Sequence, residues 1–335
     1  MPVHMKKTGI IIEFKNGAVK DASYGMIACA RNGGGDSLYA FVINEDAQVH
    51  KEALEAHGIH NIVDICLPEI GTCKESGSQA GWNPVIWSQA VMEAMQIHGI
   101  SELFGLTTPM GRELLPRIAA KLDAPLVMDC IEVNCSEGIV QNYLYSGKTL
   151  ATIKVKGDIR IYGIRPNVIE PAPAPVSASM FTVTYSNAHK NEPDCGKITL
   201  LESRPGDNSD GDLLEADVII SGGRGMQNGE NFKLLHQCAR YLGAKVGASR
   251  VAVDLGWVPY SMQVGQTGEK VSPRVYIACG LSGSVQHFAG MKMSGMIIAI
   301  NNNPNAAIMA NCDYFIEGDL FDVIPALTEA LSKAK

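Results

Sequence analysis

The sequence predicts an α/β protein built from two doubly wound domains. Short apolar runs alternate with helical patterns in both halves of the chain, which is typical of parallel sheets covered by helices. A polar, glycine-rich stretch, SRPGDNSDGD (203–212), interrupts the alternation. The 335 residues suffice for two domains at the usual ~100–200 residues each. We therefore expect an N-terminal domain over 1–202 and a C-terminal domain over 203–335.

The first 132 residues carry the clearest alternation. Three apolar runs are expected to be strands: GIIIEF, LYAFVI and NIVDIC. Helical patterns cover 20–31, 49–57 and 110–122, and in the last of these the apolar side chains from Leu114 to Leu122 recur on one helical face. Pro116 within that segment predicts a kink or an early-turn position. This part of the chain is expected to form a parallel sheet with packed helices.

The period of the pattern changes to two between residues 137 and 165. The runs IVQNYLY, TLATIKV and IRIYGIRP are separated by turns at 146–148 and 156–158, so we expect an antiparallel meander appended to the parallel sheet. PAPAPV (171–176) is expected to be extended. Strand-like FTVTYS (181–186) and KITLLE (197–202) follow it.

The second half restarts the α/β alternation and is expected to be doubly wound and Rossmann-like. The helices are expected near 230–242 and at the C-terminus, where Asp322 is the predicted cap and Pro325 falls in the first turn. The expected strands are ADVIISGG, KVGASR, VYIACG, MIIAIN and DYFIEGD.

The amino-acid composition argues against several classes of function. The net charge is −7 without a basic run, which argues against a nucleic-acid partner, and no run reaches the ~18 apolar residues of a membrane span. The nine cysteines form no CxxC pair, so we expect no disulfide framework and no metal or iron–sulfur site. The N-terminus has no signal-peptide or transit-peptide pattern, which favours the cytoplasm, although a processed organellar protein would look the same.

Two glycine-rich turns in the second half indicate where a ligand binds. SGGRG (221–225) and CGLSG (279–283) each follow a strand and precede a helix, so their backbone N–H groups can meet a dinucleotide at the crevice of the sheet. Between Val275 and Cys312 the only formally charged residue is Lys292, as expected either for plain core or for the wall of a site for a large, mostly apolar ligand. Such turns also occur without any ligand.

The segment between these turns contains several polar side chains that can form hydrogen bonds with the edge of a heteroaromatic ring. They are Ser249, Arg250, Gln263, Gln266 and Thr267. Pairing of Arg250 with Asp254 on a surface turn explains that residue equally well, and the residues alone favour His287 as a helix N-terminal histidine satisfied by a neighbour. The residues alone leave both alternatives open.

Taken in order, the motifs SGGRG…ENF, VGASR, DxGWVP, QVGQTG, SGSVQHFAGM, AIN and GDLF resemble the alpha subunit of the electron transfer flavoproteins. The resemblance covers 204–335 nearly without gaps and the N-terminal part more loosely. Two departures stand out: AINNNPNAAIM replaces the family's AINKDP pattern, and Tyr260–Ser261 stand where an Asn–Asp pair is frequent.

The resemblance implies that FAD binds to the C-terminal domain. His287 is then expected near the flavin O2, Arg250 over the ring system and Thr267 near N5, where they tune the redox chemistry. The glycine turns and Asn301 or Asp319 are expected to hold the pyrophosphate and adenosine end. The residues that match the family's FAD contacts are Arg224, Ser249, Arg250, Val264, Gly265, Gln266, Thr267, Ser282, Gly283, Ser284, Val285, Gln286, His287, Asn301, Asp319 and Leu320.

The resemblance also implies a function and partners. The chain is expected to pair with a beta subunit that completes the flavin pocket and holds AMP or a second FAD. It would take electrons from acyl-CoA or other dehydrogenases, as in fatty acid β-oxidation, and pass them through a flavin semiquinone to a membrane quinone oxidoreductase. This describes an electron-carrier subunit rather than a stand-alone enzyme, in the cytoplasm or, in a eukaryote, the mitochondrial matrix.

Three alternatives stay open. An electron-bifurcating relative would carry two FAD and react with NADH. A stand-alone NAD-dependent enzyme could use a similar crevice, although no catalytic triad, carboxylate pair or metal cluster accompanies it. A nucleotide-binding regulatory module would bind adenine nucleotide without redox chemistry.

Overall fold

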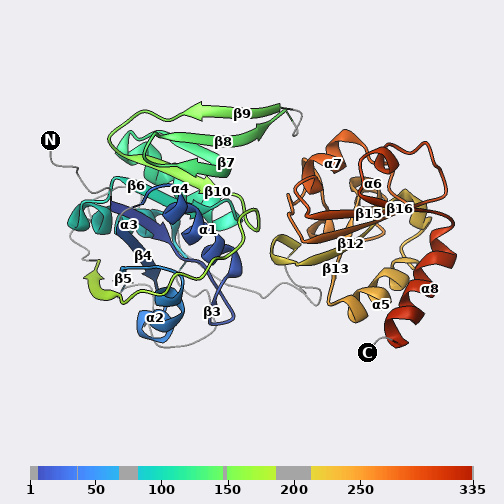
Figure 1. The fold of residues 1–335 in the computed structure, drawn as a ribbon, viewed down its shortest axis with the longest axis horizontal. Coiled ribbons are helices and arrows are strands. Elements are labelled where there is room, and N and C mark those ends of the chain that lie inside the picture. The colour runs from blue at the N-terminus through green and yellow to red at the C-terminus, as the bar shows by residue number, and fades with distance from the viewer. Residues whose placement is uncertain (1–6, 36, 68–81, 146–148, 186–212, 334–335) are drawn as a thin grey trace. The chain divides into compact units, whose positions relative to one another are not determined.

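A computed structural model describes residues 7–35, 37–67, 82–145, 149–185 and 213–333 (Figure 1). The chain divides into two compact units, here called the N-terminal unit (1–143 and 150–205) and the C-terminal unit (144–149 and 206–335). The expected boundary at 202/203, the expected strand KITLLE and the expected turn at 146–148 lie outside the described residues.

Within the described residues, the N-terminal unit holds a nine-stranded sheet in the order β11-β5-β4-β1-β6-β10-β7-β8-β9. A short hairpin, β2 (Phe14–Lys15) with β3 (Ala18–Val19), follows the first strand. The strands of the large sheet are β1 (Lys7–Ile11), β4 (Ser37–Ile43), β5 (Asn61–Cys66), β6 (Glu102–Leu106), β7 (Leu126–Asn134), β8 (Ile139–Leu144), β9 (Thr149–Lys154), β10 (Arg160–Ile164) and β11 (Ser179–Thr184).

The N-terminal sheet is doubly wound. Strand β1 pairs in parallel with β4 on one side and with β6 on the other, so the strand order reverses between β1 and β6. Helices cover both faces: α1 and α2 pack on one, α3 and α4 on the other. The helices are α1 (Asp21–Asn32), α2 (Ala47–Ala56), α3 (Pro84–His98) and α4 (Pro109–Leu122).

The expected antiparallel meander is only partly correct. Strand β8 pairs with β7 in antiparallel fashion, and β9 follows it at the edge of the sheet. The third expected strand, β10, instead inserts between β6 and β7 and runs parallel to both. All five of its residues are buried, and the buried Arg160 is neutralised by an ion pair with Glu102. A strand that is covered on both faces usually has a nearly continuous run of apolar residues. IRIYGI has this character, so its apparent apolar–polar alternation does not indicate an antiparallel strand with one exposed face.

The segment PAPAPV runs without regular secondary structure into β11, as expected for an extended chain. The backbone N–H groups of Ala174 and Val176 donate to the carbonyls of Ala56 and Glu55, and an Arg31 guanidinium N–H donates to the Ala172 carbonyl. These bonds tie the segment to α1 and α2. The segment leads into β11, which pairs in parallel with β5 on the side opposite β4.

The C-terminal unit is built on a five-stranded parallel sheet in the order β13-β12-β14-β15-β16. Its order reverses between β12 and β14, so this sheet is doubly wound as well. One face packs on α5, α6 and α8, and the other packs on α7. The elements are β12 (Val218–Gly222), α5 (Phe232–Leu242), β13 (Lys245–Ala248), α6 (Arg250–Asp254), β14 (Val275–Cys279), α7 (Val285–Met291), β15 (Met296–Asn301), β16 (Tyr314–Glu317) and α8 (Leu320–Lys333).

The start of the last helix differs from the expectation. Helix α8 begins at Leu320, and the Asp319 carboxylate accepts a hydrogen bond from the Phe321 backbone N–H at 2.9 Å, so Asp319 caps it rather than Asp322. Pro325 consequently lies inside the helix and not in its first turn. Both aspartates suit the capping role chemically, and the sequence pattern placed the boundary three residues late.

Among the described residues, we find no helix with the length and apolar character needed to span a bilayer.

Candidate functional site

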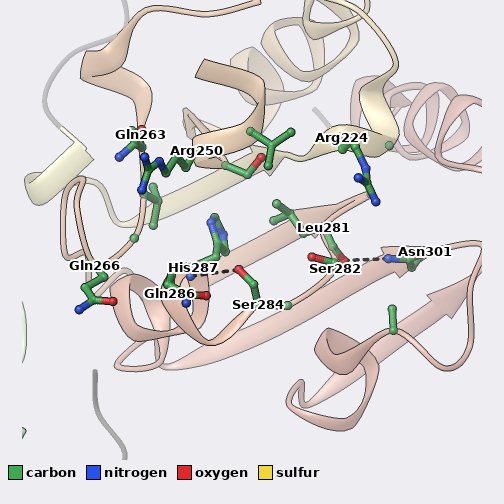
Figure 2. Close-up of a pocket in the computed structure, with 18 of the residues that line it drawn as sticks. Arg224, Arg250, Gln263, Gln266, Leu281, Ser282, Ser284, Gln286, His287 and Asn301 are labelled. Carbon is green, nitrogen blue, oxygen red and sulfur yellow. Dashed lines mark hydrogen bonds between the residues drawn. The ribbon is translucent and has the colours of Figure 1, made fainter. Parts of the chain in front are cut away.

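A cavity of about 700 Å³ opens at the carboxyl end of the C-terminal sheet, beside β12 and β14, between which the strand order reverses. In doubly wound sheets this is the point at which ligands bind. Figure 2 shows Arg250, Gln263 and His287 toward one end of the cavity and Arg224 and Asn301 toward the other. The lining residues are Arg224, Gly225, Ser249, Arg250, Val251, Gln263, Val264, Gly265, Gln266, Thr267, Gly280, Leu281, Ser282, Gly283, Ser284, Gln286, His287, Asn301, Asn303 and Ala306.

The two glycine turns pack directly against each other. The backbone N–H groups of Gly223 and Gly225 donate to the carbonyls of Cys279 and Gly280 at 3.0 and 3.1 Å. A Cβ on Gly225 would lie 2.7 Å from the Gly280 Cα, closer than carbon atoms tolerate. These two glycines therefore hold the floor of the cavity together. This differs from the expectation for SGGRG, because the N–H groups of Gly223 and Gly225 are already used and do not point at a ligand.

The turn that follows β14 requires glycine for its backbone conformation. Gly280 and Gly283 have φ values of +59° and +76°, in the left-handed region. At Gly283 an added Cβ would overlap the backbone nitrogen of Ile308. The Ser284 hydroxyl then caps α7 by accepting a hydrogen bond from the His287 backbone N–H at 3.4 Å. The turn thus sets the exposed Ser282 and Ser284 at the edge of the cavity.

A tight loop after α6 forms the wall beside Arg250. The Gln263 side chain, only 3% exposed, donates from Nε2 to the Thr267 hydroxyl oxygen at 3.1 Å. The Tyr260 hydroxyl donates to the Thr267 carbonyl oxygen at 2.5 Å. The backbone N–H of Gln266 donates to the Gln286 carbonyl, which ties the loop to α7. The expected polar cluster is therefore brought together in one wall.

His287 lies beneath the cavity in an apolar environment. Its Nε2 is 3.0 Å from the hydroxyl of Tyr276, a fully buried residue of β14, and its Nδ1 is enclosed without a hydrogen bond of normal geometry. Burial lowers the pKa of His287 to about 4, and the nearby Val264 backbone carbonyl offsets only part of that effect. The imidazole is consequently neutral at pH 7. The expectation of a histidine satisfied by a neighbour holds for one ring nitrogen.

The lining carries positive charge only. Arg224 and Arg250 are its formally charged residues, and no carboxylate is among the described residues that line the cavity. Arg250 Nε also donates to the Asp254 carboxylate at 3.2 Å, but both side chains are more than 60% exposed. Such a solvated pair contributes at most ~1 kcal/mol, so it leaves Arg250 able to turn toward a ligand.

A smaller cavity of about 80 Å³ adjoins the first and shares Gly225, Gly280 and Asn301 with it. Asp319 and Leu320, at the start of α8, line this smaller cavity. The Asn301 side chain is fixed between them: Nδ2 donates to the Leu281 carbonyl at 2.8 Å, and Oδ1 accepts from the Asn303 N–H at 3.0 Å. The two cavities together follow the carboxyl edge of the sheet.

Most residues selected from the sequence meet at these two cavities. Val285 is the exception, since it is 47% exposed and lines neither of them. The main cavity also contains residues outside the set that matches the family's FAD contacts, namely Gly225, Val251, Gln263, Gly280, Leu281, Asn303 and Ala306. Gly225 and Gly280 belong to the glycine turns and Gln263 to the polar segment, so a signal for these three was present, whereas Ala306 offers none.

No group of three or more His, Cys, Asp or Glu side chains suitable for a metal ion occurs in the described part of the chain. Burial raises the pKa of the Cys29 and Cys130 thiols to about 12, which keeps them protonated and unreactive.

Comparison with known proteins agrees with this geometry. Residues 212–292 match the electron transfer flavoprotein FAD-binding domain, and residues 8–188 match the electron transfer flavoprotein domain. The first match points to flavin binding.

Three curated relatives span nearly the whole chain, and each is an electron transfer flavoprotein subunit alpha. The Pseudomonas aeruginosa protein is 33% identical over 96% of this chain and 99% of its own length. The Bacillus subtilis protein is 35% identical over 97% of both chains. The mitochondrial protein of Oryza sativa subsp. indica is 34% identical over 98% of this chain and 91% of its own length. The chain therefore belongs to the electron transfer flavoprotein alpha subunit family.

Proposed function

We propose that this chain is the alpha subunit of a heterodimeric electron transfer flavoprotein that holds FAD in the cavity of its C-terminal unit. In this proposal it accepts electrons from acyl-CoA or other dehydrogenases and delivers them toward a membrane quinone oxidoreductase. One observation carries the proposal: residues from five separate segments of the C-terminal unit converge on one elongated cavity at the switch point of the sheet.

The residues present fit FAD. A cavity of about 700 Å³ falls in the ~300–1,000 Å³ range of small-molecule and cofactor sites. Arg224 and Arg250, without a lining carboxylate, suit a ligand that carries two phosphate charges. Asp319 in the adjoining cavity offers an acceptor for a sugar hydroxyl. The enclosed Nδ1 of His287 supplies a polar group beneath the flavin end.

FAD, when bound, supplies one- and two-electron redox chemistry, and the chain supplies binding, orientation and electrostatics. Arg250, Thr267 and His287 would surround the ring system. Arg250 contributes the only formal charge of this group at pH 7, because His287 is neutral. Thr267 contributes a hydroxyl whose oxygen already accepts from Gln263, so its proton is available to a ligand.

The opposite end of the cavity would bind the pyrophosphate and adenosine. The Arg224 side chain lies exposed at this end and makes no hydrogen bond or ion pair with any residue that the structure describes. Its guanidinium is therefore available for phosphate oxygens. Asn301, held rigidly by two hydrogen bonds, and Asp319, at the start of α8, complete this end.

Membership in the family implies a heterodimer with a beta subunit, and one surface of the C-terminal unit supports a partner. Strand β16 pairs with β15 on one side, and its Tyr314, Phe315 and Ile316 side chains are 45–61% exposed. Exposed apolar edge strands promote association. We propose that the beta subunit holds AMP in a simple carrier, or a second FAD in an electron-bifurcating complex.

The test is co-expression with the beta subunit, followed by a visible spectrum, quantified flavin per heterodimer and stepwise reduction. One FAD per heterodimer and transfer of electrons from an acyl-CoA dehydrogenase to a quinone oxidoreductase support the proposal. Two FAD with NADH reactivity would replace the simple carrier by the bifurcating alternative. Flavin-free protein that binds nicotinamide, or that binds AMP or ATP without redox activity, would refute both.

A further inference from the structure

The hydroxyl of Tyr260 makes a hydrogen bond that reaches into the wall of the cavity. Tyr260 is 65% exposed and belongs to the short 3-10 turn Tyr260–Met262, yet its hydroxyl donates to the carbonyl oxygen of Thr267, seven residues further on, at 2.5 Å. A carbonyl oxygen can only accept, so the phenol is necessarily the donor. An exposed tyrosine has many other rotamers, and this contact keeps it in one.

Thr267 is thereby held at two points. Gln263 Nε2 donates to its hydroxyl oxygen at 3.1 Å, and Gln263 itself is almost fully buried. Tyr260 fixes the backbone of the same residue. Thr267 and Gln263 line the cavity, whereas Tyr260 does not. Gln263 therefore acts from inside the cavity wall and Tyr260 acts from outside it.

Backbone hydrogen bonds hold the loop on both sides of Thr267, and the Gln266 N–H bond to the Gln286 carbonyl at 2.8 Å is one of them. The Gly265 N–H donates to the Glu269 carbonyl at 3.1 Å, the Gly268 N–H donates to the Gly265 carbonyl at 3.3 Å, and the Glu269 N–H donates to the Gln263 carbonyl at 2.8 Å. Gly265 and Gly268 flank Thr267 closely, and glycine leaves the backbone more free than any other residue. Within the described residues, the backbone of Thr267 itself makes no other hydrogen bond, so the clamp on its carbonyl helps to define where its hydroxyl lies.

We propose that Tyr260 is a positioning residue that clamps Thr267 and so fixes the Thr267 hydroxyl at the ring end of the cofactor site. The proposal rests on the proposed function, because it assigns the cavity to FAD. The bond is neutral and partly solvated, for which the net contribution is ~0.5–1.5 kcal/mol, equivalent to roughly two- to tenfold in an equilibrium constant.

The experiment compares Tyr260→Phe with Tyr241→Phe in the heterodimer. Tyr260→Phe removes the hydroxyl and keeps the ring. Tyr241→Phe is the matched control, since Tyr241 is a 40% exposed tyrosine of the same unit, on α5, and lies outside both cavities. Amide hydrogen exchange of Gly268 and Glu269, the Kd for FAD and the potential of the first one-electron couple are measured for each variant.

In Tyr260→Phe we expect exchange at Gly268 and Glu269 to accelerate roughly two- to tenfold and the Kd for FAD to rise by a similar factor. The first potential should fall by at most ~60 mV, the tenfold limit of this bond converted at ~59 mV per tenfold, and by less to the extent that the oxidised flavin also loses affinity. All three quantities should stay unchanged in Tyr241→Phe.

Two results would overturn the assignment of Tyr260. The first is exchange, affinity and potential in Tyr260→Phe that match the wild type. The second is acceleration of exchange throughout the C-terminal unit, which would make Tyr260 a general stabiliser of the fold. Absence of flavin from the wild-type heterodimer would instead refute the proposed function, and it would be recognised before any variant is made.

Discussion

Replacing His287 should remove a specific acid sensitivity from the C-terminal unit. The imidazole is buried and neutral, with a pKa near 4 in the folded chain against 6.5 when it is free in water. As the pH falls from 6.5 to 4, the unfolded chain binds a proton at this position and the folded chain does not, so the free energy of unfolding decreases. At about 1.36 kcal/mol per pKa unit, the loss is about 3 kcal/mol, or roughly two orders of magnitude in the equilibrium constant.

The assay is amide hydrogen exchange of Tyr276 and Ile277 in the central strand β14, measured from pH 4.5 to pH 7 in wild type and in His287→Gln. After correction for the intrinsic exchange rates, protection in the wild type should weaken steeply toward acid, and the variant should lack most of this slope. Burial also lowers the pKa of His50 and His98, but both lie in the N-terminal unit and contribute equally to the two proteins. Parallel pH profiles would show that His287 does not titrate as argued.

Two further substitutions test the cavity. Gly283→Ala should destabilise the C-terminal unit by about 1–2 kcal/mol through the left-handed backbone and by a further ~1–3 kcal/mol through overlap with Ile308, as measured by denaturant unfolding. Gly243→Ala, at φ +64° with open space around it, should show the backbone cost alone, and equal effects would contradict the steric argument. Arg224→Gln should raise the Kd for FAD roughly 10- to 150-fold by loss of a charge-assisted contact worth ~1.5–3 kcal/mol, as followed by flavin fluorescence. Arg240→Gln, on the exposed side of α5, should leave this Kd unchanged, and a similar loss in both variants would indicate a general charge effect.

The sequence predicted the parallel sheets well, because buried strands read as apolar runs and the helices between them have a clear period. The antiparallel prediction for β10 was wrong, because a short run such as IRIYGI also fits an alternating pattern when the strands that pair with it are unknown. The pairing that decides the matter is with β6 and β7, which are distant in sequence. The Arg160–Glu102 ion pair, which permits a charged residue in a covered strand, is equally invisible from local pattern.

Local chemistry was also insufficient at the start of α8. Asp319 and Asp322 are both able to cap a helix, and only the observed bond to the Phe321 N–H distinguishes them. Proline in a first turn is common enough that Pro325 favoured the wrong choice. The helix-capping rule and the proline rule, each valid in general, therefore predicted the same incorrect start for α8.

At the candidate site, the glycine turns and the polar segment are recognisable along the chain, and the family resemblance supplied the remaining expected residues, such as Asn301 and Asp319. The sequence missed Ala306 and Leu281, which line the cavity only because of how the turns fold over it. It also could not reveal that Tyr276, an apparent core residue of β14, contacts His287. A residue such as Tyr276, which acts through its contact with another side chain, is not marked by a motif in the sequence.

The interlocked glycine turns restrict how this family of sequences can vary. A Cβ on Gly280 would lie 2.8 Å from the Gly225 Cα, and a Cβ on Gly225 would lie 2.7 Å from the Gly280 Cα, so neither position can accept a side chain while the other strand end stays in place. The two turns are 55 residues apart along the chain, yet a side chain added at either one would push the other away. A chimera that takes the segment before residue 230 and the segment around residue 280 from different relatives should therefore keep this contact whenever both parents carry glycine at both positions.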